Sequence, residues 1–352
     1  MTTKRSATKP RVLILGCGGT IAMVPEEGTG SLVPAKTVDE ITRLVPSLAE
    51  QADLELVQIE NRDSTELNPS HWTKFAMQVA EAMVSGKYDG IVVTHGTDTM
   101  AYSATAVALI LGRRITIPVV FTGSQLPLVS FGTDARFNLE NAMRIILQAR
   151  EQHLAEVMIV FSKYALRASR SIKISESDFV AFGSPAFPPL AEISSVGIRF
   201  IRETWLASKK ALKLNDLDFN FQRGVVVLDL VPGLEQGIVF DIIRGGKCQA
   251  LILRSLGAGN VPSLDEYSLI PCIAAASDLK IPTIVTTKFV GGTTHAGIYK
   301  PGRAALDAGA IESGNLTDVA TQVKTMWLLS QGYRANTIQR ALLTPVAGEV
   351  SR

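Results

Sequence analysis

Short apolar runs alternate with longer amphipathic stretches along the first 200 residues of the chain. The apolar runs predict buried strands, and they read VLILG from Val12, GIVVTHG from Gly90, ITIPVVFTG from Ile115 and VMIVFS from Val157. A further run, DLELVQIE from Asp53, alternates apolar and polar residues as an amphipathic strand does. Helical periodicity predicts helices over residues 71–84, 97–111 and 134–148. This alternation predicts an α/β fold with a doubly wound, mostly parallel sheet and right-handed crossovers.

A polar, charged segment at residues 208–222 interrupts this rhythm and is interpreted as a linker. The strand pattern resumes with GVVVLDL, QALILRS and IPTIVTTK, and helices are expected over residues 264–277 and 319–331. A length of 352 residues also favours two domains over one. The sequence therefore predicts a polar N-terminal extension (1–10), a larger N-terminal α/β domain (11–207), the linker (208–222) and a smaller C-terminal α/β domain (223–352).

Composition and charge narrow the choice of partners and compartment. The chain is 46% hydrophobic and 19% charged, with a formal net charge of +2. So small a net charge disfavours nucleic acid and membrane surfaces as partners. Cys17, Cys248 and Cys272 are too few and too far apart for a disulfide framework or a zinc site. The first ten residues lack the apolar core of a secretory signal, so we expect a cytoplasmic protein.

Three polar clusters follow predicted strands directly. They are Gly16–Thr20, Asp63–Glu66 and Thr94–Thr99. Each cluster taken alone is typical of a tight turn or a helix cap. The first lacks the glycine spacing of a nucleotide-binding loop, and residues 24–34 behind it have the composition of a lid. Because ligands gather at the carboxyl ends of parallel strands, the three clusters together predict one crevice that binds a small zwitterion.

At these residues the chain resembles the bacterial-type L-asparaginase family, and its cytosolic branch more closely than its periplasmic branch. The matching motifs are GGTIA (18–22), DST (63–65), HGTDTMAYSA (95–104), FTGSQLPL (121–128), ALRASRSIK (165–173), FVAFGSP (179–185), LILRSLGAGNVP (251–262) and AGAIESGNLTDVATQVK (308–324). The resemblance implies hydrolysis of L-asparagine to L-aspartate and ammonia through an acyl-enzyme. It implies no metal or cofactor, and an assembly that is a homodimer or a dimer of dimers.

The resemblance also implies roles for individual residues. Thr20 matches the nucleophile, and Thr97, Asp98 and Lys173 match a second catalytic group in which the lysine and the aspartate form a buried pair. Arg170 lies close in sequence to Lys173, which is preferred for its distance from the FVAF segment. The residues that match substrate-binding positions are Ser64, Thr65, Asp98, Ser124 (through its backbone carbonyl) and Asn260, the last from a neighbouring subunit.

Two departures from the family pattern bear on activity. The tyrosine that relatives carry in the lid is absent, because Gly30-Ser31-Leu32 occupies the matching stretch and leaves Glu26 and Glu27 as the nearest titratable groups. Ile172 replaces a threonine at the allosteric site of some cytosolic members, so allostery is not expected although Arg254 is kept. Glutaminase activity, a tRNA-dependent amidotransferase subunit and a non-catalytic asparagine or aspartate sensor are the alternatives. The amidotransferase is disfavoured, because the resemblance begins almost at the first residue.

Overall fold

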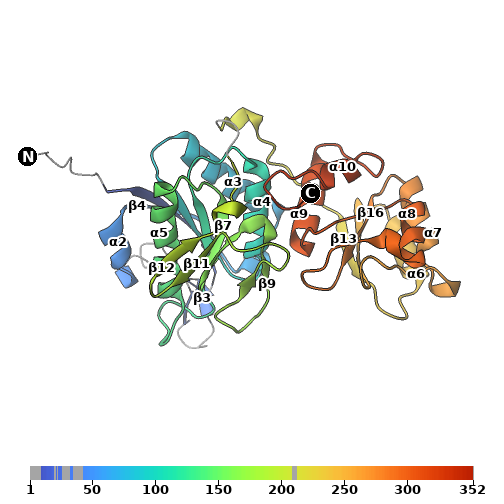
Figure 1. Ribbon diagram of the computed structural model, residues 1–352, viewed down its shortest axis with the longest axis horizontal. Coiled ribbons are helices and arrows are strands. Elements are labelled where there is room, and N and C mark those ends of the chain that lie inside the picture. Colours follow the sequence, from blue (N-terminus) through green and yellow to red (C-terminus); the bar gives the residue numbers. More distant parts are fainter. Residues whose placement is uncertain are drawn as a thin grey trace, which may run out of the picture. The chain divides into compact units, whose positions relative to one another are not determined.

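The computed structural model describes residues 9–19, 21, 23–25, 32–34, 43–207 and 212–351 (Figure 1). The chain forms two compact units. The first contains residues up to Gly183 together with Pro189–Leu217, and the second contains Ser184–Pro188 and Asp218 onward. The predicted combination of a larger N-terminal and a smaller C-terminal α/β domain is confirmed. The first unit extends into the predicted linker, because the 3₁₀ helix η5 (Leu214–Asp216) packs against a helix of that unit.

Within the described residues, the first unit is built on an eight-stranded sheet of order β12-β11-β8-β7-β6-β5-β1-β4. Its strands are β1 (Arg11–Gly18), β4 (Asp53–Arg62), β5 (Gly90–Thr94), β6 (Val119–Thr122), β7 (Val157–Phe161), β8 (Tyr164–Arg167), β11 (Ala191–Ser194) and β12 (Gly197–Phe200). The strands from β4 to β7 pair in parallel, as predicted. Strands β1, β5 and β7 are almost wholly apolar, which fits a sheet that is covered on both faces.

Helices cover both faces of this sheet. They are α2 (Ser47–Gln51), α3 (Pro69–Val84), α4 (Met100–Leu111) and α5 (Ala135–Glu151), with 3₁₀ turns η2 (Ser64–Glu66), η3 (Ala168–Arg170) and η4 (Arg202–Thr204). Figure 1 shows α2 and α5 on one side of the strands and α3 and α4 on the other. Strand residues alternate between the faces, so Val12 and Ile14 join a core with Leu48 of α2 and Leu139 of α5.

Two small antiparallel ladders complete the first unit. One joins β2 (Met23–Pro25) to β3 (Leu32–Pro34) in the predicted lid, and the other joins β9 (Ile172–Lys173) to β10 (Phe182–Gly183). The remaining lid residues, including Glu26 and Glu27, lie outside the described residues.

The strand–helix alternation predicted up to residue 200 ends earlier, at Phe161. Beyond β7 the chain turns back through Ser162, which has a φ of +51°, and β8 pairs with β7 in the antiparallel direction. Strands β11 and β12 continue this antiparallel edge. The prediction was wrong here because a tight turn replaces the crossover helix that a parallel strand needs.

Over residues 218–351 the second unit has a four-stranded parallel sheet of order β13-β14-β15-β16. Its elements are β13 (Val225–Asp229), α6 (Gln236–Arg244), β14 (Ala250–Ser255), η6 (Asp265–Tyr267), α7 (Ile270–Asp278), β15 (Thr283–Thr287), η7 (Ala296–Ile298), α8 (Lys300–Asp307), β16 (Ala310–Glu312), α9 (Asp318–Ser330) and α10 (Ile338–Leu342). Leu251 and Leu253 face a core shared with α6 and α7, whereas Ile252 faces α9 and α10. The helix predicted over residues 264–277 begins only at Ile270, because Asp265 has a left-handed φ of +55° and breaks it.

Candidate active site

The order of the strands places a crevice at the carboxyl ends of β1 and β5. These strands are neighbours, but the strand that follows β1 in this sheet is β4 on one side, and the strand that follows β5 is β6 on the other. The loops after β1 and β5 therefore leave in opposite directions. In α/β sheets, ligands bind at the carboxyl ends of two such strands. All three polar clusters noted in the sequence begin at this edge.

Glycines bring the three turns into direct contact. The backbone of Gly19, after β1, lies on Gly96, after β5, with no space for a Cβ atom between them. A Cβ on Gly96 would in turn lie 2.7 Å from the Ser64 side chain, after β4. The turn after β6 joins them, because Gly123 packs on the carbonyl of His95. Four separate strand ends therefore converge on one spot, as the sequence predicted for three of them.

Lys173 links the two functional side chains of the turn after β5. Its ammonium Nζ donates to Thr97 Oγ1 at 2.8 Å and to Asp98 Oδ1 at 2.6 Å. The short ladder between β9 and β10 holds Lys173 opposite Phe182 and so supplies the lysine from a separate segment. An ammonium in this position can hold the threonine hydroxyl and stabilise negative charge that develops on it.

Lys173 and Asp98 form the expected ion pair, but the expectation that this pair is buried is wrong. The Lys173 side chain is 18% exposed, but that of Asp98 is 55% exposed, whereas Thr97 is buried. Asp98 lies in the turn beyond the end of β5 and is exposed to solvent. An exposed carboxylate is accessible to the ammonium group of a ligand.

Ser64 and Thr65 occupy the 3₁₀ turn η2 after β4. The carboxylate of Asp63 accepts hydrogen bonds from the backbone N–H of Thr65 at 2.8 Å and from its hydroxyl at 2.7 Å. The carbonyl of Ser64 accepts from the hydroxyl of Thr99 at 2.7 Å, which fastens this turn to the turn after β5. The Ser64 side chain is buried and lies against Gly96. The structure therefore places both residues beside Thr97 and Asp98.

Ser124 lies in the turn after β6 and is buried. Its hydroxyl donates to the carbonyl of Leu126 at 2.6 Å. That bond engages the Ser124 side chain inside its own turn.

The buried side chain of His95 supports the turn after β5. Its ring is fully buried between Phe75 and Phe121, and burial lowers its pKa to about 4, although a hydrogen bond to Gly96 opposes this. The neutral ring pairs through Nδ1 with the Gly96 carbonyl at 2.7 Å and through Nε2 with the Ser103 hydroxyl at 2.8 Å. Since a carbonyl can only accept, Nδ1 carries the proton and Nε2 accepts. His95 therefore orients the turn.

Two predicted site residues, Thr20 and Asn260, remain to be located. Thr20 lies outside the described residues, between Gly19 and the buried Ile21. Asn260 belongs to the second unit, where its backbone closes a turn with Leu256. The side-chain oxygen of Asn260 is buried and has no hydrogen-bond partner in the described part of the chain. Arg254, also in the second unit, is already paired with Asp229 and Asp318.

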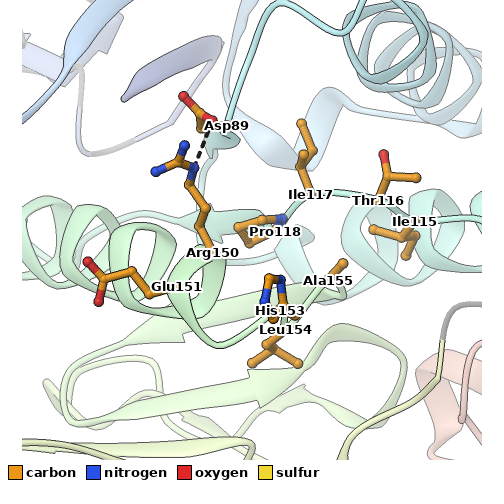
Figure 2. Close-up of a pocket in the computed structure, with 10 residues that line it drawn as sticks. All are labelled: Asp89, Ile115, Thr116, Ile117, Pro118, Arg150, Glu151, His153, Leu154 and Ala155. Carbon is orange, nitrogen blue, oxygen red and sulfur yellow. Dashed lines mark ion pairs between the residues drawn. The ribbon is translucent and has the colours of Figure 1, made fainter. Parts of the chain in front are cut away.

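A cavity of about 570 Å³ lies at the amino-terminal ends of the central strands of the first unit's sheet (Figure 2). Its lining comes from the segments that precede β5, β6 and β7, so the length of a strand, about 15 Å, separates it from the crevice. Arg150 in this cavity is paired with Asp89 at 2.7 Å, and Asp89 also accepts from the backbone of Arg11. None of the predicted site residues contributes to its lining.

Sequence reasoning missed Asp134 and Asn138, which hold the turn after β6, and it gave no role of its own to Asp63, which holds the turn after β4. Asp63 and Asp134 both precede helical turns, where an acidic residue normally signals only a cap. No pattern in the sequence indicates that Asp134 instead binds backbone N–H groups of the turn after β6.

Two features frequently found in other protein classes are absent from the described ranges. No group of three or more His, Cys, Asp or Glu side chains there could hold a metal ion. Among the same residues, no helix has the length and apolar character that crossing a membrane requires.

Comparisons with known proteins agree with this geometry. The family model "Asparaginase, N-terminal" matches residues 11–206, and "Glutaminase/Asparaginase C-terminal domain" matches residues 224–342. An L-asparaginase of Thermococcus kodakarensis is 31% identical over 97% of this chain and 99% of its own length. A glutamyl-tRNA(Gln) amidotransferase subunit of Pyrococcus abyssi is also 31% identical, over 97% of this chain and 77% of its own length.

Solved structures show the same relationship. L-asparaginase I from Vibrio cholerae superimposes with a TM-score of 0.83 at 27% identity, covering 98% of this chain and 100% of the other. The two family models together span both units of the fold, and the relatives match across nearly the whole chain. This chain therefore belongs to the asparaginase family and is a hydrolase of that family.

Proposed function

We propose that this protein is an L-asparaginase that hydrolyses L-asparagine to L-aspartate and ammonia, with Thr20 as the nucleophile. The observation that carries the proposal is the bridge from Lys173 to both Thr97 and Asp98, at the edge where Gly19 lies on Gly96. Gly19 directly precedes Thr20 in the chain, and the contact of its backbone with Gly96 supports the choice of Thr20 as the nucleophile.

The proposed reaction is a double displacement. The hydroxyl oxygen of Thr20 attacks the side-chain carbonyl carbon, the C–N bond breaks, and the amide nitrogen takes up a proton and leaves as ammonia. Water then attacks the aspartyl ester, which releases aspartate and restores the threonine. A threonine hydroxyl needs a proton acceptor to act in this way. With no tyrosine in the lid, Glu26, Glu27 and the Thr97–Lys173 group are the candidates for that role.

The substrate's charged groups match the polar groups around the crevice. We assign the α-carboxylate and α-ammonium to Ser64 and Thr65, with the exposed Asp98 carboxylate accepting from the ammonium. The backbone carbonyl of Ser124 accepts from the leaving amide nitrogen. Backbone N–H groups around Thr20 and Thr97 stabilise the oxyanion.

We further propose a cytoplasmic homo-oligomer. The proposal rests on the match of Asn260 to a residue that asparaginases insert into the site of a neighbouring subunit. The three cysteines are buried free thiols, as is usual in a reducing compartment. Sedimentation of the wild-type protein tests the assembly: a fully active monomer would contradict it.

The activity is tested by ammonia release from L-asparagine, with L-glutamine in parallel. The extra methylene of glutamine is worth about 1–3 kcal/mol, so specificity is a measured ratio and not an absolute property. We expect Thr20→Ala to abolish turnover and to retain the fold and asparagine binding. Full activity of Thr20→Ala would overturn the mechanism.

Two other outcomes identify the alternatives. Calorimetric binding of asparagine or aspartate without ammonia release would indicate a sensor. The relative from Pyrococcus abyssi is named a glutamyl-tRNA(Gln) amidotransferase subunit, so charged tRNA should be supplied in a separate reaction. Ammonia release that depends on the tRNA would favour that activity over free asparagine hydrolysis.

A further inference from the structure

Helix α5 begins with an acidic residue that does not cap it. Asp134 occupies the N-cap position, yet its side chain makes no capping hydrogen bond to a backbone N–H group of its own helix. The hydroxyl of Thr133 accepts from the N–H of Ala135 instead, at 3.0 Å. A carboxylate at a helix start usually satisfies the free N–H groups of that helix. Asp134 is therefore used elsewhere.

The carboxylate of Asp134 holds the turn after β6. It accepts from the N–H of Gln125, at 3.0 and 3.1 Å to its two oxygens, and from the N–H of Leu126 at 3.0 Å. The Thr133 hydroxyl also donates to the Leu126 carbonyl, at 3.2 Å. Asp134 is only 8% exposed, and charge-assisted bonds in a water-poor setting are short and strong.

Asn138, one helical turn further on, completes the attachment. Its amide Nδ2 donates to Asp134 Oδ2 at 3.0 Å and to the Gly123 carbonyl at 2.9 Å. Its Oδ1 accepts from the N–H of Ser162, at the end of β7, at 2.8 Å. The side chain is fully buried. Asp134 and Asn138 thus bind the turn at Gly123, Gln125 and Leu126, on both sides of Ser124.

This turn lies against the proposed catalytic turn. Gly123 packs on the carbonyl of His95 and on the Met100 side chain, so the two turns have a fixed spacing. A carbonyl that must accept from a leaving group needs a position accurate to about 0.5 Å. Within the described residues, the side chains at the start of α5 that hydrogen-bond to the peptide groups on either side of Ser124 are those of Asp134 and Asn138.

We infer that Asp134 and Asn138 are positioning residues that place the Ser124 carbonyl for departure of the amide nitrogen. The inference rests on the proposed function, in which this carbonyl accepts an N–H of the leaving group. It predicts that hydrolysis of a substrate without that N–H does not depend on the hydrogen bonds from Asp134 and Asn138 to the turn after β6. The β-methyl ester of L-aspartate is such a substrate, because its leaving group is methanol and the acyl group is the same.

The test compares amide and ester hydrolysis in two variants of Asp134 and one control. Asp134→Ala removes the acceptor. Asp134→Asn keeps the size but turns an NH₂ group toward backbone or Asn138 donors. The control is Asn141→Ala, two turns along the same helix from Asp134. The amide of Asn141 is buried like that of Asn138, but it donates to the Ser162 carbonyl and not to the turn after β6.

For both Asp134 variants we expect kcat on L-asparagine to fall by about 10²-fold, as for loss of one well-placed hydrogen bond to the reacting groups. KM should change by less than about threefold, and ester hydrolysis by less than about fivefold. Asn141→Ala should reduce both reactions equally. Equal losses on amide and ester in the Asp134 variants would overturn the inference.

Hydrogen exchange keeps the inference testable if the proposed function fails. We expect the backbone amides of residues 123–126 to exchange at least tenfold faster in Asp134→Ala than in Asn141→Ala. Unchanged protection there would overturn the positioning role, whatever the activity. A wild-type protein that releases no ammonia, combined with faster exchange in Asp134→Ala, would reject the proposed function and support the attachment of the turn.

Discussion

The backbone of Gly19 lies directly on the backbone of Gly96, with no room for a Cβ atom on Gly19. Gly19 also has a φ of +89°, in the left-handed region. We expect Gly19→Ala to separate the turns after β1 and β5 and to reduce kcat/KM for asparagine by at least 10²-fold, because a displacement of about 1 Å is that costly. Steady-state ammonia release measures it.

Gly86→Ala is the matched control for this substitution. Gly86 has a φ of +64°, so an alanine meets a similar backbone strain of about 1–2 kcal/mol, but nothing lies within 4 Å of its Cβ. We expect Gly86→Ala to lower the stability by that amount and to retain activity. A similar loss of activity in both variants would show that strain, and not the contact with Gly96, is responsible.

Removing the ammonium of Lys173 should slow the chemical step. Lys173→Met keeps most of the side-chain volume but removes the donors to Thr97 and Asp98. We expect kcat to fall by about 10²–10⁴-fold, the usual contribution of a positioned proton-transfer group, with little change in melting temperature. Lys163→Met is the control, since Lys163 is exposed and its ammonium group lies over the Tyr164 ring, away from Thr97 and Asp98 in the contacts described. A kcat within threefold of wild type would remove Lys173 from the mechanism.

The buried ring of His95 should make folding sensitive to acid. Burial lowers its pKa to about 4 in the folded protein, against about 6.5 in the unfolded chain. The unfolded state therefore binds the proton first. This contribution to stability is complete above pH 6.5 and is lost as the pH falls toward 4, by about 3 kcal/mol in total.

Urea unfolding at pH 7, 5.5 and 4.5 measures this loss. His95→Gln retains a polar side chain that can bond to Ser103 but cannot titrate, so the comparison removes the contribution of acidic groups. We expect the stability difference between wild type and His95→Gln to shrink as the pH falls. Parallel pH profiles would contradict the assignment.

The second unit contains a buried ion pair whose loss should destabilise the fold far more than the loss of an ion pair on the surface. Lys324 and Glu349 are fully buried and 2.5 Å apart, and Lys324 also donates to the carbonyls of Leu342 and Thr344. Lys324→Met would leave the Glu349 carboxylate without its partner, so we expect a loss of about 3–5 kcal/mol in urea unfolding.

The exposed pair of Arg199 and Glu192 provides the comparison, because Arg199 is 68% exposed. Arg199→Met should cost less than about 1 kcal/mol. We also expect Lys324→Met combined with Glu349→Gln to be more stable than Lys324→Met alone, since the unpaired charge is removed. A double variant as unstable as the sum of its parts would argue against a direct pairing.

The parallel core of the first unit could be predicted because its signal is local. The runs at Val12, Gly90 and Val157 are apolar on both faces, which only strands covered by helices require. The antiparallel edge formed by β8, β11 and β12 carries no such signal. Its strands are only four residues long, and their pairing depends on the turn at Ser162 and not on periodicity.

The sequence also could not indicate which chain segments belong to which unit. Residues 184–188 belong with the second unit, although the chain on both sides of them belongs to the first. Contact across such a sequence distance depends on packing, which a pattern of neighbouring residues does not encode.

The sequence by itself determined which residue types stand at the carboxyl ends of the strands, because strand polarity and glycine turns are readable from the order of residues. Thr97, Asp98, Ser64 and Thr65 follow from that order and from the motifs around them. Only the tertiary structure decided that Lys173 reaches Thr97 from a separate ladder, that Asp98 stays exposed, and that Asp134 holds the turn containing Ser124. The reason is physical: these contacts join residues that are 8 to 76 positions apart in the chain. The distances in space between such residues are set by packing between elements and not by the properties of any one of them.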